Sequence, residues 1–251
     1  MPSPRQPLSV VIITLNAAGQ LADCLASARF ADEVVVVDSG SADGTIELAT
    51  QAGARVIQQA WLGFGPQKQF AVSQAAHDWV LCLDADERVS PELRGAIEAA
   101  LVAPEAAGFR FPRCNRFLGR YLRHGEGYPD LSLRLLDRRQ GHWSADPVHE
   151  KVECSGPVGQ LAGDLLHESA ETLASYLTKQ NRYTSLAAEA ALARGKRASV
   201  GRLVFSPVVR FVKFYVVRQG FRDGWPGLVH IAIGCFNSFA KYAKMLESRR
   251  S

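Results

Sequence analysis

The sequence predicts an α/β protein whose sheet is mostly parallel. Three runs at residues 8–15, 33–38 and 79–84 have the length of strands and are dominated by Val, Ile and Leu. Segments of helical length separate them. Strands that are apolar on both faces lie in a sheet covered on both sides, and helices between them indicate β-α-β units with right-handed crossovers. We therefore expect a Rossmann-like sheet flanked by helices.

The first third of the chain supplies most of these units. Helices are expected near residues 19–28, from Thr45 onward and across 67–76, and a weaker strand at 54–57. In open sheets of this kind, ligands bind beyond the carboxyl ends of the strands. The first ligand-binding candidates are therefore the residues that end three strands, namely Asn16, Asp38 and Asp84.

The middle third has shorter elements. Residues 91–102 have the pattern of an amphipathic helix, with Ser90 as its N-cap and Pro91 in its first position. Strands are expected at 108–112 and 131–137. A long helix is expected at 171–195, ended by Gly195.

Composition excludes several classes of protein. The chain has 251 residues, of which 47% are hydrophobic and 22% charged, so it is long and apolar enough to bury a core and is not a disordered protein. Its five cysteines are odd in number and form no C-x-x-C pair, which argues against a disulfide framework or a zinc knuckle. Reduced thiols fit a cytosolic setting, and the run at 8–15 fits a buried strand better than a signal peptide.

The charge is unevenly distributed along the chain. From Arg194 onward there are twelve Lys or Arg and only two acids, whereas the preceding residues have 17 basic and 23 acidic side chains. We therefore divide the chain into a main domain at residues 1–195 and a basic, amphipathic helical tail at 196–251. The apolar stretches at 203–221 and 224–240 are interrupted by charges or are short for a membrane span. A helix lying in a membrane interface is favoured, and helices packed on the domain are the alternative.

Acidic residues follow the strand at 79–84. Asp84, Asp86 and Glu87 lie within four positions. An isolated D-x-D is often a solvated turn or the charged start of a helix. At the end of a buried strand, however, such a pair can hold Mg²⁺ or Mn²⁺, and these ions often take their other ligands from water and substrate phosphates.

A second polar segment follows the strand at 33–38. Asp38 is succeeded by Ser39, Gly40 and Ser41, which are small enough for a tight turn beside a ligand. Neither G-x-G-x-x-G nor G-x-x-x-x-G-K-[ST] occurs, which argues against a dinucleotide-dependent dehydrogenase and a P-loop ATPase. A carboxylate here is suited to accept hydrogen bonds from a base or a ribose.

Together these motifs resemble those of a known family. The ordered segments "SVVIITLNAA", "VVVVDSGSADGT" and "WVLCLDADERV" are similar to those of family 2 inverting glycosyltransferases, which have the GT-A fold. The resemblance continues at residues 127–152 and 214–228, where the chain is similar to bacterial lipopolysaccharide inner-core β-1,4-glucosyltransferases that act on heptose.

The resemblance implies a role for each polar position. Asp86 would ligate Mg²⁺ or Mn²⁺, and His167 would be either a late metal ligand or a structural histidine. Lys68 is followed by Gln69, whereas many relatives have Asn after this basic residue. The nucleotide-sugar site would consist of Thr14, Asn16, Asp38, Ser39, Lys68 and Asp84. Of these, Asp84 would contact either the ribose or the metal.

Inverting transfer also requires a base on the acceptor side. The base takes the proton of the acceptor hydroxyl as that hydroxyl attacks the anomeric carbon. Glu150 is the first candidate because it lies where related enzymes bring in their base. Asp130 and Glu126 are the alternatives, and each of the three could be an ordinary surface acid.

Basic residues in the middle of the chain indicate an anionic acceptor. They would bind its phosphate through bidentate contacts or, alternatively, form a solvated face. These residues are Arg110, Arg113, Arg116, Arg120, Arg123 and Arg134.

These features predict a metal-dependent inverting transferase at the cytoplasmic face of the bacterial inner membrane. The donor would be a nucleotide sugar, UDP-glucose first, and the acceptor an anionic glycolipid, with inner-core heptose favoured. A transferase acting on polyprenyl phosphate and a non-catalytic nucleotide-sugar binding protein are the alternatives. The basic tail is interleaved with aliphatic residues, which argues against nucleic acid as a partner.

Overall fold

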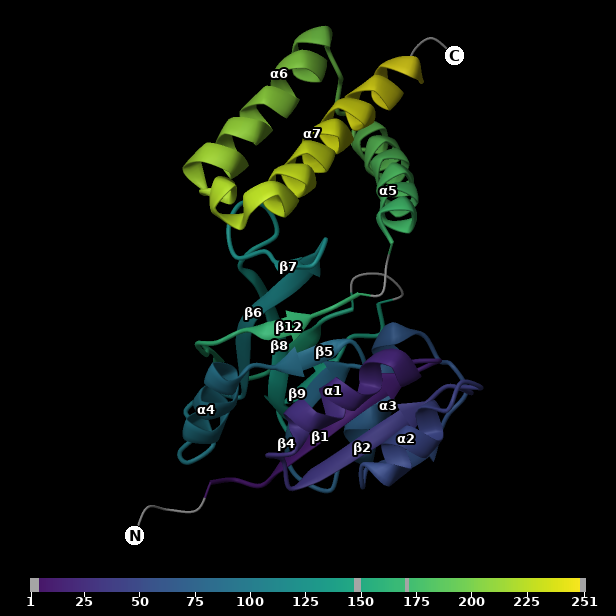
Figure 1. Ribbon diagram of the computed structural model, residues 1–251, viewed down its shortest axis with the longest axis vertical. Coiled ribbons are helices and arrows are strands. Elements are labelled where there is room, and N and C mark those ends of the chain that lie inside the picture. Colours follow the sequence, from purple (N-terminus) through teal and green to yellow (C-terminus); the bar gives the residue numbers. More distant parts are fainter. Residues whose placement is uncertain (1–4, 147–149, 170–171, 249–251) are drawn as a thin grey trace. The chain divides into compact units, whose positions relative to one another are not determined.

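The computed structural model describes residues 5–146, 150–169 and 172–248. The chain forms two compact units (Figure 1). The first, here called the sheet unit, comprises Met1–Arg113 and Asp130–His167. The second, the helical unit, comprises Cys114–Pro129 and Glu168–Ser251.

Four parallel strands form one half of the main sheet. Their order is β3 (Arg55–Gln58), β2 (Glu33–Asp38), β1 (Leu8–Thr14) and β4 (Trp79–Asp84). In their register Thr14 lies opposite Asp38, and Ile13 lies opposite Asp84. The carboxyl ends of β1, β2 and β4 therefore meet at one edge, as the sequence predicted.

Antiparallel strands extend the sheet beyond β4. The order continues with β8 (Asp130–Asp137), β6 (Gly108–Phe117), β12 (Leu165–His167) and β5 (Glu87–Val89). The short strand β11 (Val158–Gln160) pairs with β6, and β9 (Gly141–Trp143) pairs with β10 (Val152–Cys154) in a separate ribbon. Because β5 and β12 are neighbours, the segment after the D-x-D motif lies beside His167.

Helices cover both faces of the sheet. The sheet unit contains α1 (Ala18–Ala28), α2 (Thr45–Gln51), α3 (Phe64–Gln74) and α4 (Pro91–Ala100). On β1, Val10 and Ile12 belong to one buried cluster and Val11 to another, so neither face is exposed to water. Burying each such side chain contributes about 1.5–3 kcal/mol. This arrangement confirms the predicted fold class, an α/β protein with helices on both faces of a largely parallel sheet.

The predicted helix boundaries are close to those observed. The Ser90 hydroxyl accepts a hydrogen bond from the Leu93 amide at 3.2 Å, which confirms the predicted cap of α4. Helix α3 begins at Phe64, three residues before the predicted start. Pro66 lies in its first turn, where a backbone donor is not needed, so proline does not prevent the helix from starting earlier.

Three long helices dominate the helical unit. They are α5 (Leu173–Ala193), α6 (Val200–Phe211) and α7 (Gly224–Glu247). A π-helical turn at Val212–Val217 and a 3₁₀ turn at Gly220–Asp223 join the last two, and β7 (Arg120–Tyr121) pairs with the end of β6. The predicted stop of α5 is present, since Gly195 has a φ of +69°, which glycine adopts without strain.

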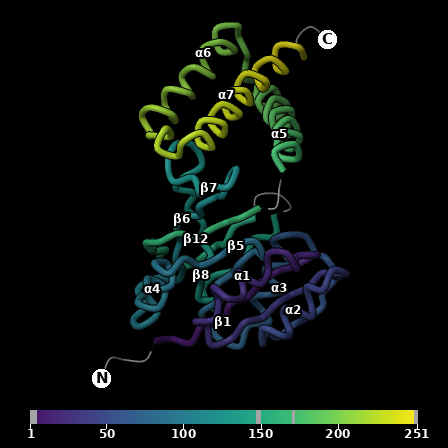
Figure 2. The backbone as a smooth tube through the Cα atoms, viewed as in Figure 1, coloured from purple at the N-terminus to yellow at the C-terminus, as the bar shows by residue number. Residues whose placement is uncertain are grey.

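Helix α7 packs against both α5 and α6 (Figure 2). The side-chain amide of Asn237 donates to Gln180 of α5 at 2.7 Å, and the hydroxyls of Ser206 and Ser238 lie 2.6 Å apart between α6 and α7. Because α5 packs on α7, the compact helical unit begins before the boundary predicted at residues 195 and 196, and it also includes Cys114–Pro129. None of the helices in the described part of the chain is long and apolar enough to cross a membrane.

Candidate active site

The end of β2 is organised by a buried carboxylate. Asp38 is fully buried and accepts hydrogen bonds from the Thr14 hydroxyl at 3.0 Å, the Gly40 amide at 2.9 Å and the Ser41 amide at 2.8 Å. The Ser41 hydroxyl is a fourth donor. Burial alone would raise the pKa of Asp38, but these hydrogen bonds outweigh it and lower the pKa. Asp38 and Thr14 thus shape the loop after β2, and their contact with a nucleotide stays a prediction.

Asn16 fastens the same loop from the end of β1. Its backbone adopts a left-handed conformation with a φ of +50°, which Asn tolerates better than most residues. The side-chain oxygen of Asn16 accepts a hydrogen bond from the backbone amide of Ala42 at 3.0 Å, and the backbone amide of Asn16 donates to the Ser41 hydroxyl at 2.8 Å. The predicted nucleotide-binding residues of β1 and β2 are therefore brought together.

Gln67 links Ser39 to the start of α3, a role that the sequence did not reveal. Its side chain is fully buried, and its amide donates to the Ser39 hydroxyl at 3.0 Å and to the Gln59 carbonyl at 3.3 Å. Its side-chain oxygen accepts from the Leu62 amide at 3.2 Å. The only available signal was a polar residue in the first helical turn after the glycine-rich "GFG" segment.

Asp84 ends β4 between two cations. Its carboxylate lies 2.9 Å from a guanidinium nitrogen of Arg134 and 3.2 Å from Nζ of Lys68. Burial opposes ionisation of Asp84, but the charges of Arg134 and Lys68 outweigh it and hold the pKa well below its usual range. Asp84 is therefore ionised at neutral pH.

Glu87 is the buried partner of two arginines. Its side chain is fully buried, and it lies 2.6 Å from Nε of Arg113 and 3.0 Å from Arg134, while its other oxygen accepts the Asp84 amide at 3.0 Å. Sequence reasoning grouped Glu87 with the acids of the D-x-D motif and assigned it no role. A buried carboxylate needs such partners because an unpaired charge there is strongly destabilising.

Arg134 does not belong to a solvated face. Its side chain is 8% exposed. Burial would lower its pKa, but the carboxylates of Glu87 and Asp84 outweigh that effect and raise it. The solvated-face interpretation is therefore wrong for Arg134, which fixes Asp84 and Glu87, whereas its contact with an acceptor phosphate stays a prediction.

Lys68 joins Asp84 to Glu150. It is almost fully buried, and its Nζ lies 3.1 Å from Oε1 of Glu150. The indole ring of Trp143 contacts two cations, with its centroid 4.8 Å from the Lys68 nitrogen and 5.4 Å from the Arg134 guanidinium. The structure thus brings together the predicted base and two predicted donor-site residues.

The backbone at Trp143 and Ser144 packs closely on α3, and so does Glu150. A side chain on Gly65 would place its Cβ 2.2 Å from the Ser144 carbonyl oxygen and 3.3 Å from Cβ of Glu150. Gln69 accepts a hydrogen bond from the Trp143 amide at 2.8 Å. Gly65 allows the close approach, and Gln69, the position that departs from many relatives, holds β9 against α3.

Asp86, which directly precedes β5, lies beside His167, the last residue of β12. Oδ2 of Asp86 lies 3.1 Å from Nε2 of His167, and both side chains are partly exposed. One carboxylate oxygen and one imidazole nitrogen suit Mn²⁺, and they also suit Mg²⁺ that keeps water or phosphate ligands. Among the residues with described positions, no cluster of three or more His, Cys, Asp or Glu could hold a metal by itself. The pair therefore fits a metal that takes its other ligands from water and a substrate.

The other candidate bases have different surroundings. Asp130 is exposed at the first residue of β8, where it lies opposite Arg113 in the register. Glu126 belongs to the helical unit and is bound by Arg210 there. Only Glu150 of the three candidates has a described contact with the Lys68 and Asp84 cluster.

Comparison with known proteins places the chain in a family. The model of Glycosyl transferase family 2 matches residues 9–154. Lipopolysaccharide core biosynthesis glycosyltransferase LpsC of Rhizobium meliloti (strain 1021) is 33% identical, over 97% of this chain and 93% of its own length. An uncharacterized glycosyltransferase of Rickettsia felis is 30% identical, over 97% of this chain and 90% of its own.

Similarity to solved structures is weaker. Glucosyl-3-phosphoglycerate synthase from Mycobacterium tuberculosis, in complex with Mn²⁺ and uridine-diphosphate-glucose, has a TM-score of 0.38 and 24% identity over 44% of each chain.

Proposed function

The chain belongs to glycosyltransferase family 2, and from this membership we propose a metal-dependent, inverting transfer of a hexose from a UDP-sugar, UDP-glucose first. The observation that carries the proposal is the contact of Lys68 with both Glu150 and Asp84, at 3.1 and 3.2 Å. One ammonium group thereby holds the predicted base beside the carboxylate predicted to bind the donor.

In the proposed reaction, the oxygen of an acceptor hydroxyl attacks the anomeric carbon of the donor sugar. Glu150 accepts the hydroxyl proton, and the bond between the anomeric carbon and the diphosphate oxygen breaks. This single displacement inverts the configuration at the anomeric carbon. Lys68 keeps the Glu150 carboxylate oriented toward the site, and Arg134 and Glu87 prevent Asp84 from moving.

Asp86 and His167 are the residues proposed to hold the divalent cation. A divalent cation bound there would offset the negative charge of the departing diphosphate. Asp84 is already held by two cationic side chains, so we assign it to the donor and not to the metal. This assignment chooses between the two roles that the resemblance allowed for Asp84.

The acceptor is proposed to be an anionic glycolipid of the lipopolysaccharide inner core. The relative from Rhizobium meliloti is named for lipopolysaccharide core biosynthesis, which supports this class of acceptor. Such an acceptor is anchored in a membrane, so the proposal requires a surface that binds one.

The helical unit offers such a surface. Helix α6 has no buried residue, and Val204, Phe205 and Val208 are 53%, 67% and 55% exposed. On α7, Trp225 and Phe236 are also more than half exposed. Exposed aliphatic and aromatic side chains beside Lys and Arg are typical of a helix lying in a membrane interface. These features support peripheral binding to a membrane, for which we propose the cytoplasmic face of the inner membrane.

The test is release of UDP from a panel of UDP-sugars, with and without Mn²⁺ or Mg²⁺. Deep-truncated lipopolysaccharide and an isoprenyl phosphate serve as the two acceptors. Metal-dependent release that only the lipopolysaccharide stimulates would support the proposal. Stimulation by the isoprenyl phosphate alone would reassign the acceptor, and a protein that binds UDP-glucose but transfers it to neither lipid would contradict the proposal.

A further inference from the structure

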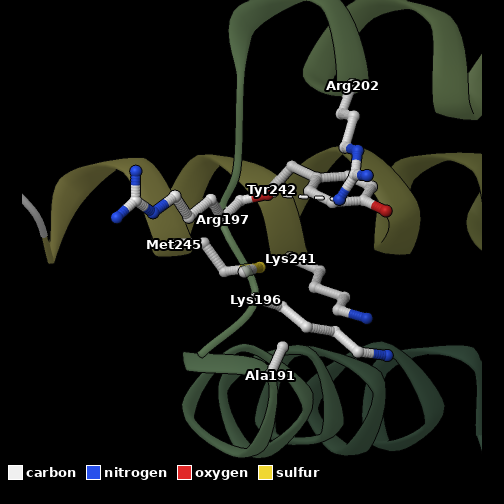
Figure 3. Close-up of a pocket in the computed structure, with 7 residues that line it drawn as sticks. All are labelled: Ala191, Lys196, Arg197, Arg202, Lys241, Tyr242 and Met245. Carbon is white, nitrogen blue, oxygen red and sulfur yellow. Dashed lines mark hydrogen bonds between the residues drawn. The ribbon is translucent and has the colours of Figure 1, made fainter. Parts of the chain in front are cut away.

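A pocket of about 650 Å³ lies among the three long helices of the helical unit (Figure 3). Its floor includes Ala191 of α5 and Met245 of α7, which are 7% and 1% exposed and belong to one apolar cluster. The volume lies in the range of small-molecule sites, about 300–1,000 Å³. The pocket is separate from the candidate active site, whose residues all belong to the sheet unit.

Positive charge lines this pocket. Lys196 precedes α6, Arg202 lies in the first turn of α6, and Lys241 lies on α7. Within the described residues of the helical unit, Lys196, Arg202 and Lys241 have no carboxylate partner. None of the residues that line the pocket is an acid. Arg116 and Arg210 of the same unit, by contrast, are paired with Glu168 and Glu126. Three unpaired cations that share one pocket repel each other unless an anion binds there.

The charged groups point in one direction. In Figure 3 the ammonium groups of Lys196 and Lys241, the guanidinium of Arg202 and the hydroxyl of Tyr242 lie on the same side, whereas the Arg197 side chain extends to the opposite side. Arg202 is held in place because it donates a hydrogen bond to the Arg197 carbonyl at 3.2 Å. Arg202 is therefore oriented before any ligand arrives, and the other donors lie on the same side of the pocket.

We propose that this pocket binds a phosphate monoester carried by a membrane lipid. A phosphate monoester carries a charge of about −1.5 to −2 and three strong acceptor oxygens, which match two ammonium groups, one guanidinium and a hydroxyl. A phosphodiester has less charge and fewer terminal oxygens, so it is a poorer match.

The neighbouring surface favours a lipid over a soluble phosphate. Helix α6, which supplies Arg202, exposes Val200 and Val204 on its first two turns, at 68% and 53%. An anion bound by Arg202 would thus lie beside apolar side chains that can enter the acyl region of a bilayer. The inference rests on the membrane binding proposed above and adds a specific headgroup to it.

The experiment measures binding of the full chain to phosphatidylcholine vesicles that contain either phosphatidic acid or phosphatidylglycerol. Lipid fractions are adjusted to equal surface charge, so that only the monoester headgroup differs. We expect binding to phosphatidic acid to be at least about fivefold tighter, because the monoester makes more charge-assisted hydrogen bonds. The substitutions K196Q, R202Q and K241Q together should remove that preference.

The matched control replaces three exposed cations outside the pocket, as R182Q, K213Q and R222Q. It removes the same total charge and should weaken binding to both vesicles while keeping the preference for phosphatidic acid. The single variant K241Q is measured as well, because it keeps the test valid if the triple variant does not fold. Its thermal unfolding midpoint should equal that of the wild type. Soluble glycerol phosphate is titrated separately by calorimetry.

Each result decides the question. A preference lost only in the pocket variants supports the lipid phosphate site. Equal preference for the two vesicles, or the same loss of preference in the control triple, overturns it while leaving the membrane binding proposal intact. If the chain binds soluble glycerol phosphate as tightly as it binds the phosphatidic acid vesicles, the phosphate ligand need not belong to a lipid, and that part of the proposal is overturned. A chain that binds neither vesicle overturns both proposals, whereas UDP release tests the transferase independently.

Discussion

Nζ of Lys68 lies 3.1 Å from Oε1 of Glu150, although 82 positions separate the two residues in the chain. The same nitrogen lies 3.2 Å from Asp84 at the end of β4. Three polar side chains from α3, β4 and the segment after β9 therefore meet at one point. This meeting point is where the proposed chemistry takes place, and it determines which substitutions are most informative.

Glu150→Gln should abolish sugar transfer while leaving UDP-sugar binding nearly unchanged. The amide keeps the shape of the side chain but cannot accept the hydroxyl proton, and loss of a general base costs about 10²–10⁴-fold in rate. Initial rates of UDP release and calorimetric binding of UDP-glucose measure the two effects. Asp130→Asn is the matched control and should retain transfer. Near-normal turnover by Glu150→Gln would remove this residue from the mechanism.

Asp86→Ala should weaken metal-dependent donor binding as well as transfer. Its carboxylate is a proposed ligand of the divalent cation, and because it lies 3.1 Å from His167, the two side chains could both bind one ion. The measurement is a Mn²⁺ titration of UDP-glucose affinity in the wild type, Asp86→Ala and Glu150→Gln. Only Asp86→Ala should shift the Mn²⁺ midpoint. An unchanged midpoint would assign Asp86 to the solvated turn that the isolated motif also allowed.

Arg134→Met should strongly destabilise the sheet unit. It leaves the fully buried Glu87 with one cationic partner fewer, and breaking a buried ion pair costs about 3–5 kcal/mol. Urea unfolding measures the change in the free energy of unfolding. The control is Arg94→Met, which removes an exposed pair with Glu98 and should cost about 0.3–0.5 kcal/mol. Equal effects of the two substitutions would show that the buried network contributes little.

Replacement of two helical glycines, Gly65 and Gly95, by alanine should change the stability of the protein in opposite directions. In Gly65→Ala the new Cβ would lie 2.2 Å from a backbone oxygen of Ser144, so Ser144 and the neighbouring Glu150 must shift. Such overpacking costs about 1–3 kcal/mol and should reduce transfer by more than about tenfold, because the base is displaced. Gly95 of α4 has open space beside it, because no atom beyond the backbone of its own helix and its chain neighbours lies within 4 Å of the point that a Cβ would occupy. Gly95→Ala should therefore stabilise the protein by about 0.4–1 kcal/mol.

Thermal unfolding and UDP release, measured on both glycine variants, test this contrast. A fully active Gly65→Ala protein would mean that the position of Glu150 is not constrained by α3, and the base assignment would lose its structural support.

Local patterns in the sequence determined much of the fold. The apolar runs predicted β1, β2 and β4 because a strand covered on both faces cannot carry polar side chains without partners. Ser90 and Gly195 predicted helix ends because each satisfies a local backbone requirement. The strand pattern also predicted that Asn16, Asp38 and Asp84 lie near one another, since the carboxyl ends of parallel strands share one edge.

Only the tertiary structure decided which polar residues are buried together. Glu87 and Arg134 are 47 positions apart, and Lys68 and Glu150 are 82 apart, so no local pattern relates them. The sequence suggested an arginine at the surface at position 134 and assigned no role to Gln67, because side-chain burial depends on how strands order themselves across the sheet. The division into units also followed from packing, since α5 is joined to α7 by contacts that helical periodicity cannot reveal. Periodicity encodes which face of an element is apolar, whereas the partner of a buried charge is chosen by contacts between distant segments.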